Sequence, residues 1–438
     1  MHILGHKIFV RMKDIPMYLS KHTKDSIRNR YSHSIEVGLG TEYVLSALSR
    51  TLGNEVNLNF LHIAKIIGMV HDIGHTAFSH DGEVILDSIL KKETSTFNKP
   101  IRFNANLNNF RRIEKYGLFD ILPLDVKRYA FASLIKRKKE LRAYPEYLGL
   151  KDDLYYGIEL EEKYLKSKGI RIQNKTDKTI LCQAMDLADE NRYRVTDIID
   201  ALNIYPKEKL REIIVRTVKS EVRIKDIRKL VYIDTTQFSS HKDKHIDKMT
   251  IKDLLMLLLE QESNAKTAFQ NVMNSISMAF NRNVLLSQEG KLLPKYEDIE
   301  VLREDFQNIA EKYIWGSKKV QKIKKPFNHY FTTVAEYFLC DNYNIELIDS
   351  VTYKKALLAL AHKSLHKKEK RREELILLRN FLGGLTNYKI MELFRAIKVD
   401  SFEKEHHVSV DKKEKLIYQV PMRGFEKKLD KYKKRVMY

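Results

Sequence analysis

Val70-His-Asp-Ile-Gly-His-Thr-Ala-Phe-Ser-His80 places three histidines and a carboxylate directly after an apolar run. The apolar spacing of residues 63–70 predicts a buried helix that ends at His71 and Asp72, with Gly74 in the following turn. An imidazole nitrogen and a carboxylate oxygen on neighbouring residues can both bind a divalent cation. A capped helix end with a hydrogen-bonded histidine explains an isolated His-Asp pair better, so the metal interpretation needs support from elsewhere in the chain.

Two other stretches supply that support. Arg30-Tyr-Ser-His-Ser-Ile-Glu36 places His33 near the start of an amphipathic segment. Farther along, Asp189, Tyr193 and Asp197 are spaced four residues apart in a helix-compatible segment and would share one helical face. A carboxylate, a phenol and a second carboxylate in such a row could line a pocket.

This set of residues resembles the HD-domain phosphohydrolases, and within them the deoxynucleoside triphosphate triphosphohydrolases, which include bacterial dGTPases. In that family one His, a His-Asp doublet and a distant Asp hold a divalent metal. The resemblance assigns these places to His33, His71, Asp72 and Asp189. Asp186 competes for the last place, but the family has Tyr four residues and Asp eight residues after its metal-binding Asp, which fits Asp189.

Three further blocks carry the same resemblance. Residues 71–83 are similar to the family's HDIGH-x-x-F-x-H-x-x-E signature. Residues 103–111 are similar to its F-x-x-N-x-Q-x-x-R element, with Asn108 where the family has Gln. Residues 382–388 are similar to a late A-G-M-T-D stretch, with Asn387 in place of Asp. Together with the blocks around His33 and Asp189, these make five blocks, and they occur along the chain in the same order as in the family.

The resemblance implies metal-dependent hydrolysis of a dNTP to a deoxynucleoside and inorganic tripolyphosphate. His80 would be the main proton-transfer residue, with Glu83 orienting it and His75 lying against the phosphates. Their spacing of three residues permits a contact between His80 and Glu83 if the segment is helical. In a simpler alternative, His75 and His80 only cap or hydrogen-bond neighbouring helices.

The same resemblance implies a set of substrate-binding residues. A guanidinium can bind two phosphate oxygens together, which suits a clamp at the position of Arg30. A phenol would pack against deoxyribose, and a carboxylate would bond the 3′-hydroxyl. The expected substrate-binding residues are Arg30, Tyr193, Asp197, Asn106 and Arg111. Alternatively, Tyr193 is a core aromatic residue and Asp197 a surface acid.

Cofactor and partners also follow from the resemblance. Two imidazoles and two carboxylates accept Mn, Mg, Fe, Co or Ni, so the metal's identity stays open. Relatives are oligomeric, which predicts a homo-tetramer or homo-hexamer, and some need an allosteric dNTP. Two other functions remain open: an HD phosphohydrolase that acts on another nucleotide, and a nucleotide-sensing protein that binds nucleic acid.

Composition indicates a mainly α-helical protein, because 438 residues contain only eight prolines and sixteen glycines. Two short β-branched runs, residues 212–216 and 230–234, predict a small β element, whereas residues 251–280 are helix-like. The polar stretch 91–109 predicts an active-site loop. Pro326 predicts a boundary between helices.

A chain of this length ordinarily divides into two or three domains. We expect residues 1–205 to form an HD-type catalytic core with the metal and proton-transfer residues. Residues 206–395 would form a helical region that completes the nucleotide pocket and provides oligomer contacts. Residues 396–438 would be a basic C-terminal segment.

The net charge of +21 favours anionic partners. One interpretation is a surface for single-stranded DNA, as in some members of the family, and the other is solubility combined with the lysine usage of an A/T-biased genome. The basic clusters lie at residues 318–319, 322–325, 367–372 and 427–435. Aromatic residues that could stack on bases interleave the last cluster: Tyr418, Phe425, Tyr432 and Tyr438.

The remaining features predict a soluble cytoplasmic protein. Only Cys182 and Cys340 occur, so no disulfide framework is indicated. No stretch approaches the roughly 18 apolar residues of a membrane span. The first residues lack the pattern of a signal peptide.

Overall fold

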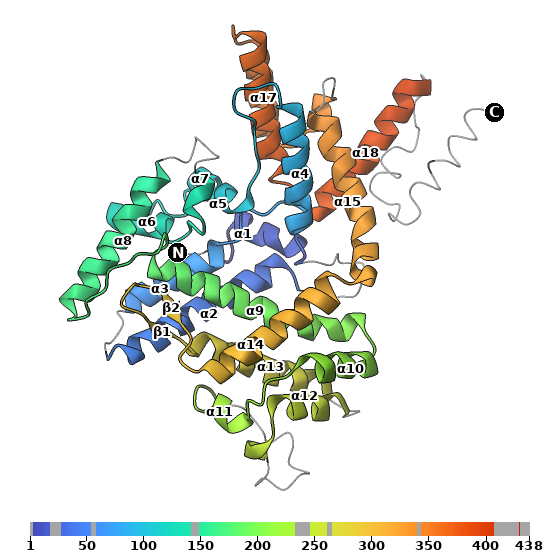
Figure 1. The fold of residues 1–438 in the computed structure, drawn as a ribbon. Coiled ribbons are helices and arrows are strands. Elements are labelled where there is room, and N and C mark those ends of the chain that lie inside the picture. Colours follow the sequence, from blue (N-terminus) through green and yellow to red (C-terminus); the bar gives the residue numbers. More distant parts are fainter. Residues whose placement is uncertain are drawn as a thin grey trace.

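The computed structural model describes residues 3–17, 28–53, 58–141, 149–232, 246–260, 265–339, 343–406 and 429. These residues form a mainly α-helical fold, as the sequence predicted (Figure 1). In the described part of the chain, no helix is long and apolar enough to cross a bilayer. The basic cluster at 427–435, its interleaved aromatics and Cys340 lie outside the described residues, apart from position 429.

The first half of the chain contains short helical turns at its start and then the helices that carry the sequence motifs. Its elements are α1 (Lys7–Val10), η1 (Arg11–Asp14), α2 (Arg30–Thr51), α3 (Leu58–Val70), α4 (Ser79–Glu93), α5 (Ala105–Lys115), α6 (Leu124–Ala132), α7 (Lys138–Leu141), α8 (Leu150–Ser167) and α9 (Ile180–Ile204). Side-chain caps begin several of these helices. The side chains of Asn29, Asn104 and Thr179 accept backbone N–H groups at the starts of α2, α5 and α9.

The second half is also helical. Its elements are α10 (Lys207–Thr217), α11 (Ile224–Arg228), η5 (Ile246–Lys248), α12 (Ile251–Glu260), α13 (Ala265–Arg282), β1 (Leu285–Leu286), β2 (Leu292–Leu293), α14 (Glu297–Ile309), the π-helical turn η6 (Ala310–Trp315), α15 (Lys318–Leu339), η7 (Ile345–Leu347), α16 (Val351–Ala361), α17 (Lys367–Leu382) and α18 (Asn387–His406). The expected helix over 251–280 corresponds to α12 and α13, with residues 261–264 outside the described part.

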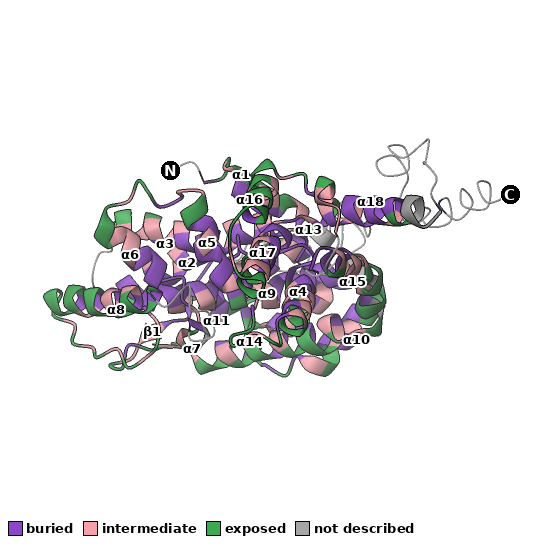
Figure 2. Cartoon of the chain, turned by 90° about the horizontal axis from the view of Figure 1, so that it is seen from above, coloured by how far each residue is buried: buried purple, intermediate pink, exposed green. Residues whose placement is uncertain are grey.

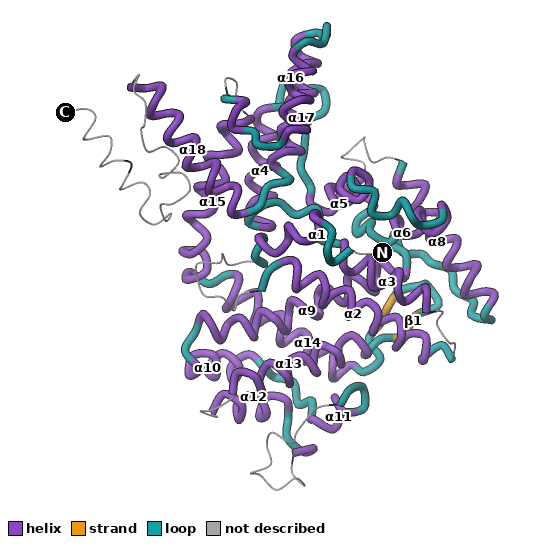
Figure 3. Tube along the Cα trace, turned by 180° about the vertical axis from the view of Figure 1, so that it is seen from behind, coloured by secondary structure: helices purple, strands orange, loops and turns teal. Residues whose placement is uncertain are grey.

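The small β element exists, but the sequence placed it wrongly. Strands β1 and β2 pair as an antiparallel hairpin at one edge of the molecule (Figure 3). Residues 212–216 instead lie in α10, because Leu210, Ile213 and Ile214 share one buried helical face that outweighs β propensity. Residues 230–232 form a turn and a bend after α11, and residues 233–234 lie outside the described residues.

Two loop predictions also change. Pro326 does not separate helices but lies inside α15. Phe331, one turn and a half later in α15, is fully buried, so tertiary packing compensates for the backbone hydrogen bond that proline cannot make. The polar stretch 91–109 is a loop only between the end of α4 and the start of α5, and its ends are helical.

Helix α9 crosses two hydrophobic cores. Its first turns, including Leu181 and Met185, belong to a core with α2, α3, α5, α6 and α8. Its last turns, including Ile198, belong to a second core with α10 and α12–α14. A third core joins α4 to α15–α18. Figure 2 shows buried residues gathered along the central helices and exposed residues on the outer faces of α8, α10 and α14.

Candidate metal centre and its surroundings

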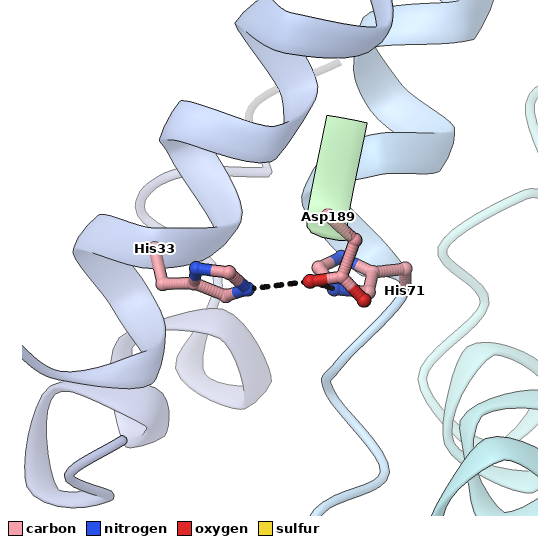
Figure 4. Close-up of side chains that lie close together, drawn as sticks. All are labelled: His33, His71 and Asp189. Carbon is pink, nitrogen blue, oxygen red and sulfur yellow. Dashed lines mark hydrogen bonds and ion pairs between the residues drawn. The ribbon is translucent and has the colours of Figure 1, made fainter. Parts of the chain in front are cut away.

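Three helices bring two histidines and a carboxylate together between the cores. His33 lies in the first turn of α2, His71 directly follows α3, and Asp189 lies in the middle of α9. The Nε2 atoms of His33 and His71 are 2.9 and 3.5 Å from Oδ1 of Asp189 (Figure 4). All three residues are buried, and their potential ligand atoms lie within 4.8 Å of one another.

Asp72 adds a second carboxylate to this cluster. Its Oδ1 is 3.3 Å from Nε2 of His71, and its Oδ2 is 3.7 Å from Nε2 of His33. The structure therefore brings all four expected ligands to one buried place. Asp186 does not join them, because its carboxylate pairs with Lys178 and lies 3.6 Å from Lys136.

The donor set fits a divalent metal. Nδ1–H of His71 donates to the carbonyl oxygen of Gly68 at 2.6 Å, which leaves a lone pair on Nε2. That Nε2 is buried without a hydrogen-bond partner among the described residues, although it faces two carboxylates. Burial would lower the pKa of His71, but Asp72 and Asp189 raise it, so the space between Nε2 and the carboxylates favours either a proton or a metal cation. Two imidazoles with two carboxylates suit a transition metal.

The turn after His71 is held by α5. Nδ2 of Asn109 donates to the carbonyl oxygen of His71, and Oδ1 of Asn109 accepts the N–H of Gly74 at 2.5 Å. Asn108 donates to the carbonyl oxygen of Gly74 at 2.6 Å. A Cβ at Gly74 would lie 2.1 Å from the carbonyl oxygen of Ala105, so only glycine allows this close approach.

Cationic neighbours keep both carboxylates ionised. Burial would raise the pKa of Asp72, but Arg30 and the adjacent imidazoles lower it well below its usual value. Burial would likewise raise the pKa of Asp189, but Lys136 and His71 lower it. Burial lowers the pKa of His33, which favours the neutral imidazole that a metal requires.

Lys136 is a member of the site that sequence reasoning missed. Its Nζ is 3.0 Å from Oδ2 of Asp189, on the side of the carboxylate away from His33. Nothing in the sequence distinguishes this lysine, because it belongs to the basic run of residues 136–139 in a lysine-rich chain. Only the fold shows that this lysine faces Asp189, one of the candidate metal ligands.

Arg30 is buried beside the cluster. Its Nη1 contacts Oδ2 of Asp72 and the hydroxyl of Tyr193, the latter at 3.1 Å. Its Nε donates to Oγ of Ser79 at 2.7 Å. Its Nη2 is buried without a hydrogen-bond partner among the described residues, so one donor remains for another oxygen.

His80 and Glu83 form a pair at the start of α4. Nδ1 of His80 is 3.3 Å from Oε2 of Glu83, and the side chain of His80 is 68% exposed. Oε1 of Glu83 accepts the N–H of Ala105 at 2.8 Å. His75 lies between this pair and the cluster, since its Nε2 is 3.2 Å from Oδ1 of Asp72 and its ring is 4.7 Å from that of His80.

Burial sets the charge of His75. Burial lowers the pKa of His75 to about 4, so its imidazole is neutral near pH 7. Together, His75, His80 and Glu83 form a second group of potential ligand atoms. The exposed member of the group, His80, is the one that a molecule in solution can reach.

Tyr193 and Asp197 continue the same face of α9 away from Asp189. The ring of Tyr193 lies 4.7 Å from that of His33. Oδ2 of Asp197 accepts the indole N–H of Trp315 at 2.6 Å. Burial and the nearby Asp200 raise the pKa of Asp197 well above its usual value. Sequence patterns could not indicate Trp315, because its contact with Asp197 spans more than a hundred residues.

Asn106 and Arg111 lie on α5, away from the cluster contacts. Arg111 donates to Oδ1 of Asn108 at 2.9 Å and to the hydroxyl of Tyr353 at 3.1 Å, which ties α5 to α16. Among the described residues, neither Asn106 nor Arg111 hydrogen-bonds to the clustered histidines or carboxylates.

A mainly α-helical fold with a buried cluster of two histidines and two aspartates, set where α2, α3 and α9 meet, defines a candidate HD-type metal protein. No family model matches the chain. Curated relatives do match parts of it, and each is called a deoxyguanosinetriphosphate triphosphohydrolase-like protein.

The protein from Vibrio cholerae is 28% identical over 182 residues, covering 40% of this chain and 39% of the relative. The protein from Clostridium tetani is 32% identical over 118 residues, covering 26% and 29%. The protein from Thiobacillus denitrificans is 26% identical over 204 residues, covering 46% and 44%. The chain thus matches less than half the length of these relatives. At this modest identity, the matches support the deoxyguanosinetriphosphate triphosphohydrolase-like family.

Proposed function

We propose that the protein hydrolyses deoxynucleoside triphosphates to a deoxynucleoside and inorganic tripolyphosphate. The observation that carries this proposal is the convergence of His33, His71, Asp72 and Asp189 beside an exposed histidine–carboxylate pair. The matched relatives support the same class of reaction through their names.

The four clustered residues would hold one divalent ion, for which Mn, Mg, Fe, Co and Ni are candidates. When bound, this ion supplies Lewis-acid stabilisation of phosphate charge and a water of lowered pKa. Lys136 adds positive charge beside Asp189, and the unpartnered Nη2 of Arg30 can donate to a phosphate oxygen.

His80 would deliver the proton that the leaving 5′ oxygen needs. Glu83 accepts the Nδ1–H of His80, which orients the ring and leaves Nε2 for proton exchange. Neutral His75 lies between His80 and the metal ligands and would contact the phosphates. Tyr193 would pack against the sugar, and Asp197 would bond the 3′-hydroxyl. Asn106 and Arg111 remain predicted substrate contacts.

Product analysis tests the reaction. The purified protein is incubated with Mn²⁺ or Mg²⁺ and each dNTP, singly and in mixtures, in water enriched in ¹⁸O. We expect deoxynucleoside free of label and tripolyphosphate that carries one ¹⁸O, because water attacks the α-phosphorus. Formation of dNMP with pyrophosphate, or no turnover with any metal, would contradict the proposal.

Assembly, location and DNA binding stay predictions. The expected homo-tetramer or homo-hexamer and the activation by a dNTP come from the family resemblance, and the expected cytoplasmic location comes from features of the sequence. For single-stranded DNA, the described basic cluster at the start of α15 lies beside the proposed active site, since Lys324 pairs with Asp81 at 2.9 Å. Binding that weakens steeply with salt would support this partner.

A further inference from the structure

Two consecutive residues with strained backbone precede His80. Phe78 and Ser79 have φ values of 58° and 59°, and among the described residues they are the only non-glycine residues with positive φ. L-amino acids avoid this region because the Cβ atom crowds the backbone. Such strain persists only where surrounding contacts enforce it, and it often marks functional sites.

Asn387 supplies the hydrogen bond that fixes this turn. Its Oδ1 accepts the N–H of Phe78 at 2.8 Å, although the two residues are more than three hundred positions apart. Asn387 begins α18 and is 5% exposed. The ring of Phe78 also packs against those of Phe327 and Phe331 on α15, at 5.4 and 6.2 Å.

The segment that leads to Asn387 is fastened to the same turn. Oγ1 of Thr76 donates to the carbonyl oxygen of Leu382 at 3.0 Å. Arg11 donates to the carbonyl oxygens of Leu385 and Ile73, both at 3.1 Å. Residues 382–387 therefore hold residues 73–78 at several points, and Asn387 is the contact nearest to His80.

The turn that carries His71 and Asp72 is held mainly by α5, and Arg30 links it to Ser79 through its contacts with Asp72 and Ser79. His71 and Asp72 precede Gly74, and α5 fixes that part of the turn through Asn108 and Asn109. Loss of the Asn387 contact would let the backbone at Phe78 relax toward negative φ. His80 would then rotate away from Glu83, while the metal ligands would keep their own hydrogen bonds.

We propose that Asn387 is a positioning residue that holds the strained Phe78–Ser79 turn and so aims His80 at the substrate. This inference rests on the proposed function of His80. The proposed reaction assigns no role to residues 382–388, and this inference provides one for that sequence block.

The test compares two substitutions of equal size. Asn387→Leu removes the acceptor, and Asn387→Asp keeps it. For Asn387→Leu we expect kcat to fall about 100-fold, with KM and bound metal per chain unchanged, because misplacing a catalytic group by about 1 Å has this effect. Asn387→Asp should restore kcat to within about threefold of the wild-type value, since its carboxylate still accepts the N–H of Phe78.

Asn283→Leu provides a matched control. Asn283 is also 5% exposed, and its Oδ1 accepts the backbone N–H of Tyr296 at 2.7 Å, next to the second core and not the active site. We expect this variant to lower the melting temperature but to keep kcat. If Asn387→Leu does not fold, Asn387→Ala replaces it with the same expectations.

Wild-type kcat in a folded Asn387→Leu variant would overturn the proposal, and so would loss of metal in parallel with kcat or failure of Asn387→Asp to rescue. His80→Ala separates this result from failure of the proposed function. If His80→Ala is fully active, the assigned role of His80 is wrong. If His80→Ala is impaired while Asn387→Leu is not, only the positioning role is wrong.

Discussion

Asp72 and Glu161 are both buried acids, but their surroundings are opposite. Asp72 is 2% exposed and lies among Arg30 and imidazoles, which lower its pKa. Glu161 is 7% exposed and is surrounded by neutral donors: the hydroxyl of Tyr129 at 2.6 Å and the N–H groups of Ile180 and Leu181. Burial raises the pKa of Glu161 to about 7.

Because both acids are buried, it is the charge of their neighbours that separates a carboxylate held ionised from one held protonated. Glu161 caps the start of α9 and stabilises the helix that presents Asp189. It also lines an apolar cavity of about 350 Å³ at the far end of α2, with Leu45, Leu48 and Leu52. None of the candidate metal ligands lines that cavity, which lies at the opposite end of α2 from His33.

Substitution of Asp72 tests whether its ionised carboxylate binds a metal ion. Asp72→Asn keeps the side-chain size but removes a charged ligand, so we expect activity to fall about 10⁴-fold, with bound metal lost as well. Metal analysis, circular dichroism and product assays on the same preparation check this. His62→Ala, an exposed histidine on α3, should keep metal and activity. Full activity of Asp72→Asn would remove Asp72 from the ligand set.

Removing His80 separates proton transfer from metal binding. For His80→Ala we expect kcat to fall about 1,000-fold with metal content unchanged, because general acid catalysis typically contributes this much. Glu83→Gln should have a smaller effect, since the amide still accepts the Nδ1–H of His80. A wild-type rate for His80→Ala would show that another group protonates the leaving oxygen.

The sequence predicted much of this fold and site for identifiable reasons. Apolar spacing predicted the helix before His71 and Asp72, but the choice of His33, His71, Asp72 and Asp189 as metal ligands came from the family resemblance. The structure brings these four residues together, and metal binding by them stays a prediction. Lys136 and Trp315 were missed because their contacts are long-range and their residue types are not specific to such a site. The strand expected at residues 212–216 was wrong because helical burial outweighed β propensity.

The pH dependence of stability tests whether Glu161 is protonated in the folded protein. The folded protein holds the proton of Glu161 up to about pH 7, whereas the unfolded chain releases it near the ordinary value of 4.5. Between these values the folded state binds more protons, so the free energy of unfolding falls as pH rises, by about 3 kcal/mol in total. Denaturant unfolding from pH 4.5 to 7.5 measures this slope.

Glu161→Gln should flatten that slope, because the amide does not titrate. The exposed Glu159 lies on the same helix, and Glu159→Gln should leave the slope as it is. An unchanged pH dependence in Glu161→Gln would show that Glu161 is already ionised in the folded protein. The contrast with Asp72 would then disappear.

Binding of the nucleoside near Asp197 can be followed by intrinsic tryptophan fluorescence, because Trp315 is the only tryptophan of the chain. Its indole N–H bonds Asp197, so a nucleoside that engages Asp197 should change the intrinsic fluorescence. Trp315→Phe removes one hydrogen bond of about 1 kcal/mol, so we expect KM to rise about fivefold while kcat is retained. If saturating dNTP changes neither the fluorescence nor, after substitution, KM, the sugar does not bind near Asp197, and the nucleoside must extend from the metal ligands in another direction.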